Sequence, residues 1–205
     1  MTKTNANGLS MLRIFLWGAV MVVGFSATLF YFFAPPNKPL AVFGGEFSMD
    51  STIGATMDGE FTQADLVGHK SLIFFGYTFC PEICPTTLSE TTSWREELEI
   101  SPQDLRIIFA TVDPKRDTIE IIGNYLAGFG TPIIGLSGSD EQVTDIKRSF
   151  GIFSQVTGDT STDEYLVDHT ASVFMVNESG SVIDTIAYGE ARASALEKVK
   201  KLMAM

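Results

Sequence analysis

The sequence predicts an α/β domain that follows a single membrane-spanning helix. Two observations lead to this prediction. From about residue 71 onward, short apolar runs alternate with stretches of helical character, and residues 14–33 form one apolar stretch without a charge. Buried strands that alternate with helices indicate a mainly parallel sheet with helices on both faces. The rest of the 205-residue chain is long enough for one core.

Residues 14–33 have the length and composition of a membrane anchor. They are rich in Phe, Val and Leu, and about 20 apolar residues match the hydrocarbon thickness of a bilayer. Arg13 precedes the stretch, and Pro35 would end a helix soon after it. Because basic residues favour the cytoplasmic side, we expect the tail, residues 1–13, in the cytoplasm and the following domain outside.

Two other interpretations fit this stretch less well. A cleaved signal peptide has an apolar core of about 7–15 residues and a small-residue cleavage site, whereas aromatic residues occupy positions 30–33. A buried core helix would show an amphipathic period, which is missing. The leader also lacks the Arg- and Ser-rich character of a mitochondrial transit peptide. The sequence therefore predicts an uncleaved anchor in a bacterial inner membrane, with a periplasmic domain.

A linker, residues 34–49, would connect the anchor to one domain, residues 50–205. The continuous apolar run 71–76 is typical of a strand buried on both faces. Asp117 with Glu120 resembles a capping box that opens a helix, and Ser139 is a candidate cap for the next helix. The expected elements are a hairpin and a helical turn near 61–66, strands at 71–76, 105–112, 132–136, 172–176 and 182–187, a polar loop at 158–164, a helix that opens at Pro81 and continues over 86–98, and helices at 117–127, 139–150 and 191–203. The βα units, followed by an antiparallel hairpin and a closing helix, describe a thioredoxin-like sheet.

The charge of the chain excludes one class of partner. With 25 acidic and 14 basic residues, the formal net charge is −11. Nucleic-acid binding needs a basic face that displaces counterions from phosphates, so we expect no nucleic-acid partner. An acidic surface instead favours cationic partners, including metal ions.

The two cysteines, Cys80 and Cys84, lie where the strand 71–76 leads into a helix. A disulfide across this short gap would constrain the unfolded chain very little, so the pair indicates chemistry rather than a structural staple. Pro81 suits the first position of a helix, and helical residues i and i+4 face the same way, so both sulfurs could reach one ion. A helix N-terminus lowers the pKa of a thiol, and the thiolate both binds metals and attacks disulfides. The motif alone leaves these two chemistries open.

His169 favours metal binding over disulfide exchange as the chemistry of the two cysteines. It comes directly before the expected strand 172–176, in a loop that should face the cysteine motif across the strand ends, where ligands gather in open α/β sheets. Two thiolates and an imidazole suit copper, since thiolates select Cu(I) and imidazole also accepts Cu(II). Zinc could bind as well, although structural zinc sites normally have four protein ligands. A hydrogen-bonded loop histidine is the alternative, and His69, in a solvated turn, has no expected role.

Residues 113–117 follow the strand 105–112 and should emerge at the same edge of the sheet. Asp113 could orient His169 or support the metal from behind its ligands. It could equally belong to a turn and helix cap in which Arg116 pairs with an acid. For Lys115, Arg116 and Asp117 we favour this structural interpretation.

Three stretches of the chain resemble the signatures of the SCO/SenC family. They are FGYTFCPEICP at 75–85, VDPKRD at 112–117 and YLVDH at 165–169, and the resemblance extends over about 43–187. It implies a thioredoxin-like fold and a copper ion, Cu(I) or Cu(II), bound by Cys80, Cys84 and His169. It also implies delivery of copper to the dinuclear copper centre of cytochrome c oxidase. Phe79 stands where some members have His, and Glu82 replaces the commoner Asp.

The resemblance implies a membrane-anchored copper chaperone whose partners are the copper-bearing subunit of the oxidase, other copper chaperones and the membrane. Oxidation of the two thiols to a disulfide would release the metal. The alternative is a thiol–disulfide reductase that keeps the copper-ligand cysteines of the oxidase reduced, with Cys80 attacking and Cys84 resolving, so enzymatic activity stays open. Two features argue against a general oxidoreductase. The cysteine spacing is CxxxC, whereas redox thioredoxins have CxxC. Thioredoxins also place a cis-proline beside their active site before the final hairpin, and residues 170–172 contain no proline. A copper or redox sensor is the third interpretation, although the tail is too short for a signalling domain.

Overall fold

The computed structural model describes residues 13, 16–18, 21, 47–51, 59–159, 161–162 and 164–205. The chain divides into two compact units, residues 1–38 and 39–205. The predicted anchor at 14–33 lies almost entirely outside the described residues, as do the tail and most of the linker. Among the residues that are described, no helix combines the length and the apolar character needed to cross a membrane.

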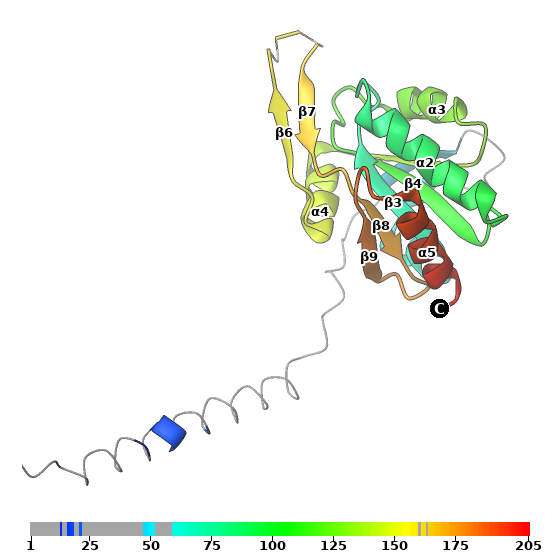
Figure 1. The fold of residues 1–205 in the computed structure, drawn as a ribbon. Helices are drawn as coiled ribbons and strands as arrows, with labels where there is room; N and C mark the ends of the chain where they lie inside the picture. The colour runs from blue at the N-terminus through cyan, green and yellow to red at the C-terminus, as the bar shows by residue number, and fades with distance from the viewer. Residues whose placement is uncertain are drawn as a thin grey trace, which may run out of the picture. The chain divides into compact units, whose positions relative to one another are not determined.

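Within the described part of the second unit, seven strands form one sheet in the order β2-β1-β5-β4-β3-β8-β9 (Figure 1). Their bounds are β1 Phe47–Ser51, β2 Gly59–Phe61, β3 Lys70–Gly76, β4 Leu105–Thr111, β5 Ile134–Ser137, β8 Val173–Val176 and β9 Val182–Ile186. The central strands β3, β4 and β5 run parallel. The pairings that flank them are antiparallel, including those of the hairpins β1–β2 and β8–β9. The prediction of a mainly parallel sheet is therefore correct only for the centre, because hairpins flank the βα units on both sides.

The centre of the sheet is buried because β3 and β4 contain the continuous apolar runs 72–75 and 107–110. Successive side chains of a strand point to opposite faces, so Phe74 and Phe75 enter different layers of the core. The Phe75 ring lies 5.2 Å from that of Phe150 and 5.9 Å from that of Phe174. The Phe74 ring lies 6.2 Å from that of Phe109. Each fully buried ring of this kind contributes about 1.5–3 kcal/mol to folding.

Helices cover both faces, as the alternation of elements predicts. Their bounds are α2 Ile83–Glu97, α3 Ile119–Ala127, α4 Asp140–Phe150 and α5 Arg192–Met203. The helices α2 and α5 contact each other, α2 packs on β3 and β4, and α5 packs on β8 and β9, so both cover the same face. On the opposite face, α4 places Phe150 against Phe75. The helix α3 packs on β5 and β1.

The helix starts confirm one predicted cap, correct another and correct one predicted first residue of a helix. Ser139 caps α4 through a capping box with Gln142. The cap of α3 is Thr118, whose hydroxyl accepts a hydrogen bond from the backbone of Ile121, and not Asp117 as predicted. Pro81 is not the first residue of its helix, because α2 begins at Ile83.

A second, two-stranded sheet was absent from the predicted elements. It consists of β6 Ser154–Thr157 and β7 Leu166–His169, which pair antiparallel on either side of the predicted polar loop 158–164. In Figure 1 this hairpin, drawn in yellow, extends away from the main sheet beside α4. Exposed and buried positions do not alternate cleanly in β6, so its pattern resembles that of a loop. The end of β7 carries His169.

Candidate metal centre

The cysteine loop, residues 77–82, connects the C-terminal end of β3 to α2. A turn in which the Cys80 backbone N–H donates to the Tyr77 carbonyl, at 3.2 Å, reverses the chain after the strand. Cys80 therefore lies in the loop, and Cys84 lies in the first turn of α2. The predicted i, i+4 pair on one helix is wrong in this respect, although the two side chains still converge.

The two thiols are free and lie in different environments. Cys80 is 9% exposed, whereas Cys84 is fully buried. The backbone N–H of Cys84 points at the Cys80 sulfur, with an N–Sγ distance of 3.4 Å. A thiolate at Cys80 would thus accept a hydrogen bond from the first turn of the helix, the position where backbone N–H groups lack partners within the helix.

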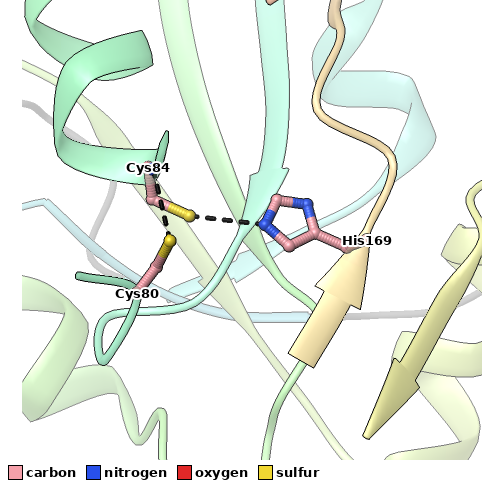
Figure 2. A group of neighbouring side chains, drawn as sticks. All are labelled: Cys80, Cys84 and His169. Atoms are coloured by element: carbon pink, nitrogen blue, oxygen red, sulfur yellow. Dashed lines mark hydrogen bonds between the residues drawn. The ribbon is translucent and has the colours of Figure 1, made fainter. Parts of the chain in front are cut away.

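His169 reaches the thiols because β8, the strand that follows it, lies beside β3. The register pairs Val173 with Phe74, which brings the segment before β8 to the end of β3 where the cysteine loop begins. The Nε2 atom of His169 lies 3.5 Å from the Cys84 sulfur (Figure 2). Its Nδ1 lies 3.0 Å from the backbone carbonyl oxygen of Thr170. Since a carbonyl only accepts, Nδ1 carries the proton of the neutral ring, and the lone pair of Nε2 faces the sulfur.

The three side chains form a compact donor set. The two sulfurs and one ring nitrogen all lie within 4.8 Å of one another. A pocket of about 290 Å³ opens over this group, lined by residues of the cysteine loop, of the start of α2 and of β7, among them Cys80 and His169. Cys84 does not line the pocket and lies beneath it. The structure thus brings together the three residues that the sequence indicates as ligands. Cys80 and His169 line the pocket, and Cys84 is buried.

Burial sets the protonation of the group. It raises the pKa of the Cys84 thiol, and the neighbouring Cys80 adds to this effect. The expectation that the helix N-terminus lowers the thiol pKa is therefore wrong for Cys84, because loss of solvent outweighs the helix dipole. Burial also lowers the pKa of His169, which keeps its ring neutral and available as a ligand. A cation bound here would offset the penalty of ionising Cys84.

Asp113 does not contact His169 in the structure. Its carboxylate lies 2.5 Å from Nε of Arg116, and its other oxygen accepts a hydrogen bond from the Tyr165 hydroxyl at 2.8 Å. All three side chains are buried. The direct orientation of His169 by Asp113 is thus not observed, whereas the predicted pairing of Arg116 with an acid is confirmed. Tyr165 completes the cluster, although its place in the third signature stretch is the one feature of the sequence that points to it.

Asp117 supports the cysteine loop instead of capping a helix. Its carboxylate accepts hydrogen bonds from the Thr78 hydroxyl and the Thr111 hydroxyl, each at 2.6 Å. The Thr78 backbone N–H also donates to it, at 3.2 Å. Burial raises the pKa of Asp117, and these hydrogen bonds oppose that shift. The carboxylate thereby fixes the loop two residues before Cys80.

The second unit is thus a thioredoxin-like α/β domain with a dithiol and an imidazole at the end of its central strand. Comparison with known proteins agrees with this class. The family model of SCO1/SenC matches residues 36–204, so the chain belongs to the SCO1/SenC family.

The chain is similar in sequence to a bacterial protein and in fold to proteins of known structure. The SCO2-like protein RP587 of Rickettsia prowazekii is 37% identical over 155 residues, which cover 71% of this chain and 74% of the relative. The copper-bound crystal structure of ScoI from Arabidopsis thaliana is similar with a TM-score of 0.67 and 29% identity, over 80% of this chain and 99% of that one. The structure of BsSco, described as a member of the Sco family of cytochrome c oxidase assembly proteins, shares the fold with a TM-score of 0.57 and 21% identity, over 83% and 98% of the two chains.

Proposed function

We propose that this chain is a membrane-anchored copper carrier that serves cytochrome c oxidase. Copper would bind to Cys80, Cys84 and His169 and would be delivered to the dinuclear copper centre of the oxidase. The observation that carries the proposal is the convergence of two sulfurs and the Nε2 lone pair within 4.8 Å. The copper found in the structure of a relative, and the oxidase-assembly role in the description of another, support it.

The donor set suits a metal that is passed on. Thiolates favour Cu(I), and the imidazole allows Cu(II) to bind as well. Three protein ligands leave a position for a ligand of the acceptor protein. Because Cys80 and His169 line the open pocket while Cys84 lies beneath it, an acceptor would exchange with the first two ligands before the third.

The anchor belongs to the same proposal. Residues 14–33 would hold the domain at the outer face of a bacterial inner membrane, with the tail in the cytoplasm. Confinement to the membrane surface raises the effective concentration at a membrane-bound oxidase. The bacterial origin of a 37% identical relative supports this location. Other copper chaperones would supply the metal.

Copper titration of the reduced full-length protein tests the donor set. His169→Ala should weaken Cu(II) binding by about 100-fold, or ~2.7 kcal/mol, because it removes one of three ligands. Cys80→Ala and Cys84→Ala should lower Cu(I) affinity at least as much. The measurement is a competition titration with a chromophoric chelator, combined with the Cu(II) spectrum.

His69→Ala is the matched control for the histidine substitution. The Nε2 atom of His69 lies 2.7 Å from Nη2 of Arg106, so the ring accepts from a guanidinium and serves the fold. Copper affinity of His69→Ala should equal that of the unsubstituted protein. Equal affinities of His169→Ala and His69→Ala would remove His169 from the proposed site.

One observation favours a second candidate function. Cys80 lines the pocket and Cys84 is fully buried, as expected for an attacking and a resolving thiol. A reductase of this kind would act on the copper-ligand cysteines of the oxidase. Fast turnover on a disulfide peptide that does not change with copper loading would favour the reductase over the carrier.

A further inference from the structure

A buried cluster of Asp113, Arg116 and Tyr165 joins the two halves of the candidate metal site. The three side chains are 4%, 8% and 8% exposed. Nε of Arg116 lies 2.5 Å from the Asp113 carboxylate, and Nη1 of Arg116 donates to the backbone carbonyl of Tyr165 at 2.9 Å. The Tyr165 hydroxyl donates a hydrogen bond to the Asp113 carboxylate at 2.8 Å. The cluster is a closed ring of contacts in which each member bonds to both others.

The guanidinium of Arg116 also lies among aromatic rings. Its carbon is 3.6 Å from the centroid of the Tyr165 ring and 4.9 Å from that of Phe79. Phe79 directly precedes Cys80, and Tyr165 directly precedes β7, which ends at His169. A single side chain from the segment after β4 thus contacts both the cysteine loop and the strand that carries the imidazole.

The strand β7 needs such a contact. It pairs with β6 in a sheet of two strands, and an isolated two-stranded hairpin is marginally stable in water. On the side of α4, the hairpin is tied through the Lys147 ammonium, which donates to the Ser154 hydroxyl at 3.0 Å. On the side of the metal site, the hairpin is tied through the Arg116 contacts to Tyr165, and the Tyr77 ring adds a contact 5.9 Å from the His169 ring.

We propose that Arg116 is a positioning residue of the copper site, held in place by Asp113 and Tyr165. It fixes β7 relative to the cysteine loop, so that Nε2 of His169 stays within reach of the two sulfurs. This inference rests on the proposed function of the three ligands. A buried ion pair adds little to stability compared with apolar side chains of similar volume, so its value here lies in fixing geometry.

The chain offers a matched control in a second buried arginine. Arg95 is 3% exposed and donates to the Leu105 carbonyl, the Thr131 hydroxyl and the Pro132 carbonyl. These contacts lie where β4 begins, at the opposite end of the strand from the segment that carries Asp113. Arg116→Lys and Arg95→Lys both keep the charge and lose the planar fork, but only the first should alter the metal site.

The test compares these variants in the full-length protein with and without copper. Arg116→Lys should weaken Cu(II) binding by about 10–100-fold, the usual effect of losing a partner behind the ligands, and should shift the Cu(II) spectrum. In the metal-free protein, amide hydrogen exchange at Val167, Asp168 and His169 should become faster. Arg95→Lys should lower the melting temperature while leaving copper affinity and exchange in β7 unchanged.

Tyr165→Phe tests the same inference with a milder substitution, in case Arg116→Lys does not fold. It keeps the aromatic ring and removes only the hydroxyl that bonds to Asp113, so we expect a loss of copper affinity in the same direction, by about 3–10-fold. Copper affinities of Arg116→Lys and Tyr165→Phe that match Arg95→Lys would overturn the inference. If His169→Ala also binds copper like the unsubstituted protein, the proposed site itself fails. If only His169→Ala is weakened, the proposed function stands and the positioning role is rejected.

Discussion

Gly76 shows how the sequence makes room for a buried thiol. A Cβ atom at this position would lie 2.8 Å from Cys84 Sγ, 2.9 Å from Phe74 Cε1 and 3.0 Å from Phe109 Cε2. Non-bonded carbon atoms pack at about 3.5–4.0 Å, so none of these positions can be kept. The two ring atoms belong to the buried centre of the sheet. The Cys84 side chain therefore occupies space that only glycine leaves free.

Gly76→Ala should lower both the stability and the metal affinity of the protein. Overpacking of a dense core reduces the free energy of unfolding by about 1–3 kcal/mol. Displacement of the Cys84 sulfur from His169 should also weaken copper binding by roughly tenfold. Chemical denaturation of the metal-free protein and copper competition measure the two effects.

Ala110→Val is the control for this substitution. Ala110 is 1% exposed and pairs with Phe75, so it faces the layer of the core opposite to Phe74 and the thiols. Its added methyl groups should reduce stability by a similar amount and leave copper affinity unchanged. Should Gly76→Ala lose stability but keep full copper affinity, Gly76 would be a packing residue only.

The candidate ligands were predictable from the sequence, whereas their environment was not. The spacing of Cys80 and Cys84 is local, and the position of His169 before a strand follows from the order of elements. The partners of Asp117 are Thr78, 39 positions away, and Thr111, on the preceding strand. The raised pKa of Cys84 depends on burial by segments distant in sequence. Patterns of adjacent residues do not contain this information, so they predict a helix cap at Asp117 and a lowered thiol pKa at Cys84.

Among the elements, the hairpin β6–β7 was missed for a related reason. Val156 and Leu166 are exposed large apolar residues, so the inside–outside alternation that identifies a strand is weak in this segment. The hairpin is instead held by tertiary contacts, among them the Arg116 bond to Tyr165 and the Lys147 bond to Ser154. By contrast, β3, β4 and α4 were predicted because continuous apolar runs and a Ser139 cap are local signals.

The helix α5 is joined to the end of β9 by one carboxylate. Glu190 accepts hydrogen bonds from the Ser194 hydroxyl at 2.6 Å, from Lys198 Nζ at 2.9 Å and from the Ala187 backbone at 3.1 Å. The hydrogen bond from Ser194, followed by that from Lys198, lowers the pKa of Glu190 from 4.5 to about 2. The carboxyl is therefore more acidic in the folded than in the unfolded chain. Its stabilisation is complete above the unfolded pKa and is lost as the pH falls from about 4.5 towards 2.

Glu190→Gln should remove this pH-dependent part of the stability. At pH 7 we expect the free energy of unfolding to fall by about 0.5–1 kcal/mol, since the partly exposed pair is screened by water. The difference from the unsubstituted protein should shrink as the pH is lowered from 5 to 3, as measured by urea denaturation at each pH. Glu197→Gln, which breaks the exposed pair with Lys200, should change stability by less than about 0.5 kcal/mol. A Glu190→Gln deficit that stays constant down to pH 3 would contradict the assignment.

At the scale of the whole domain, the candidate site exists only in the folded state. Cys84 and His169 are 85 positions apart, and their approach requires β3, α2, β7 and β8 to be in place together. The fold class was predictable because the βα units and the closing hairpin follow from local patterns. The antiparallel pairing of β1 with β5 was not, since it joins strands that are distant in sequence.

This dependence predicts that copper stabilises the domain and that its removal reverses the effect. A ligand that binds only the folded state, at a free concentration about 100 times its dissociation constant, adds ~2.7 kcal/mol. For a domain of this size that amounts to a rise in melting temperature of roughly 5–10 °C. The melting temperature of the reduced full-length protein should rise by this amount with Cu(I) and return with a Cu(I) chelator.

The same measurement distinguishes a three-ligand site that requires the fold from Cu(I) binding by the two thiols alone. In the unfolded chain, Cys80 and Cys84 remain close in sequence and can still bind Cu(I), whereas His169 is then far away. Binding to the unfolded state reduces the stabilisation. His169→Ala should therefore show a smaller copper-induced rise than the unsubstituted protein, and Cys84→Ala should show almost none. If Cu(I) raises the melting temperature of His169→Ala and of the unsubstituted protein by the same amount, the two thiols bind this ion without the imidazole. His169 would then act on Cu(II) alone.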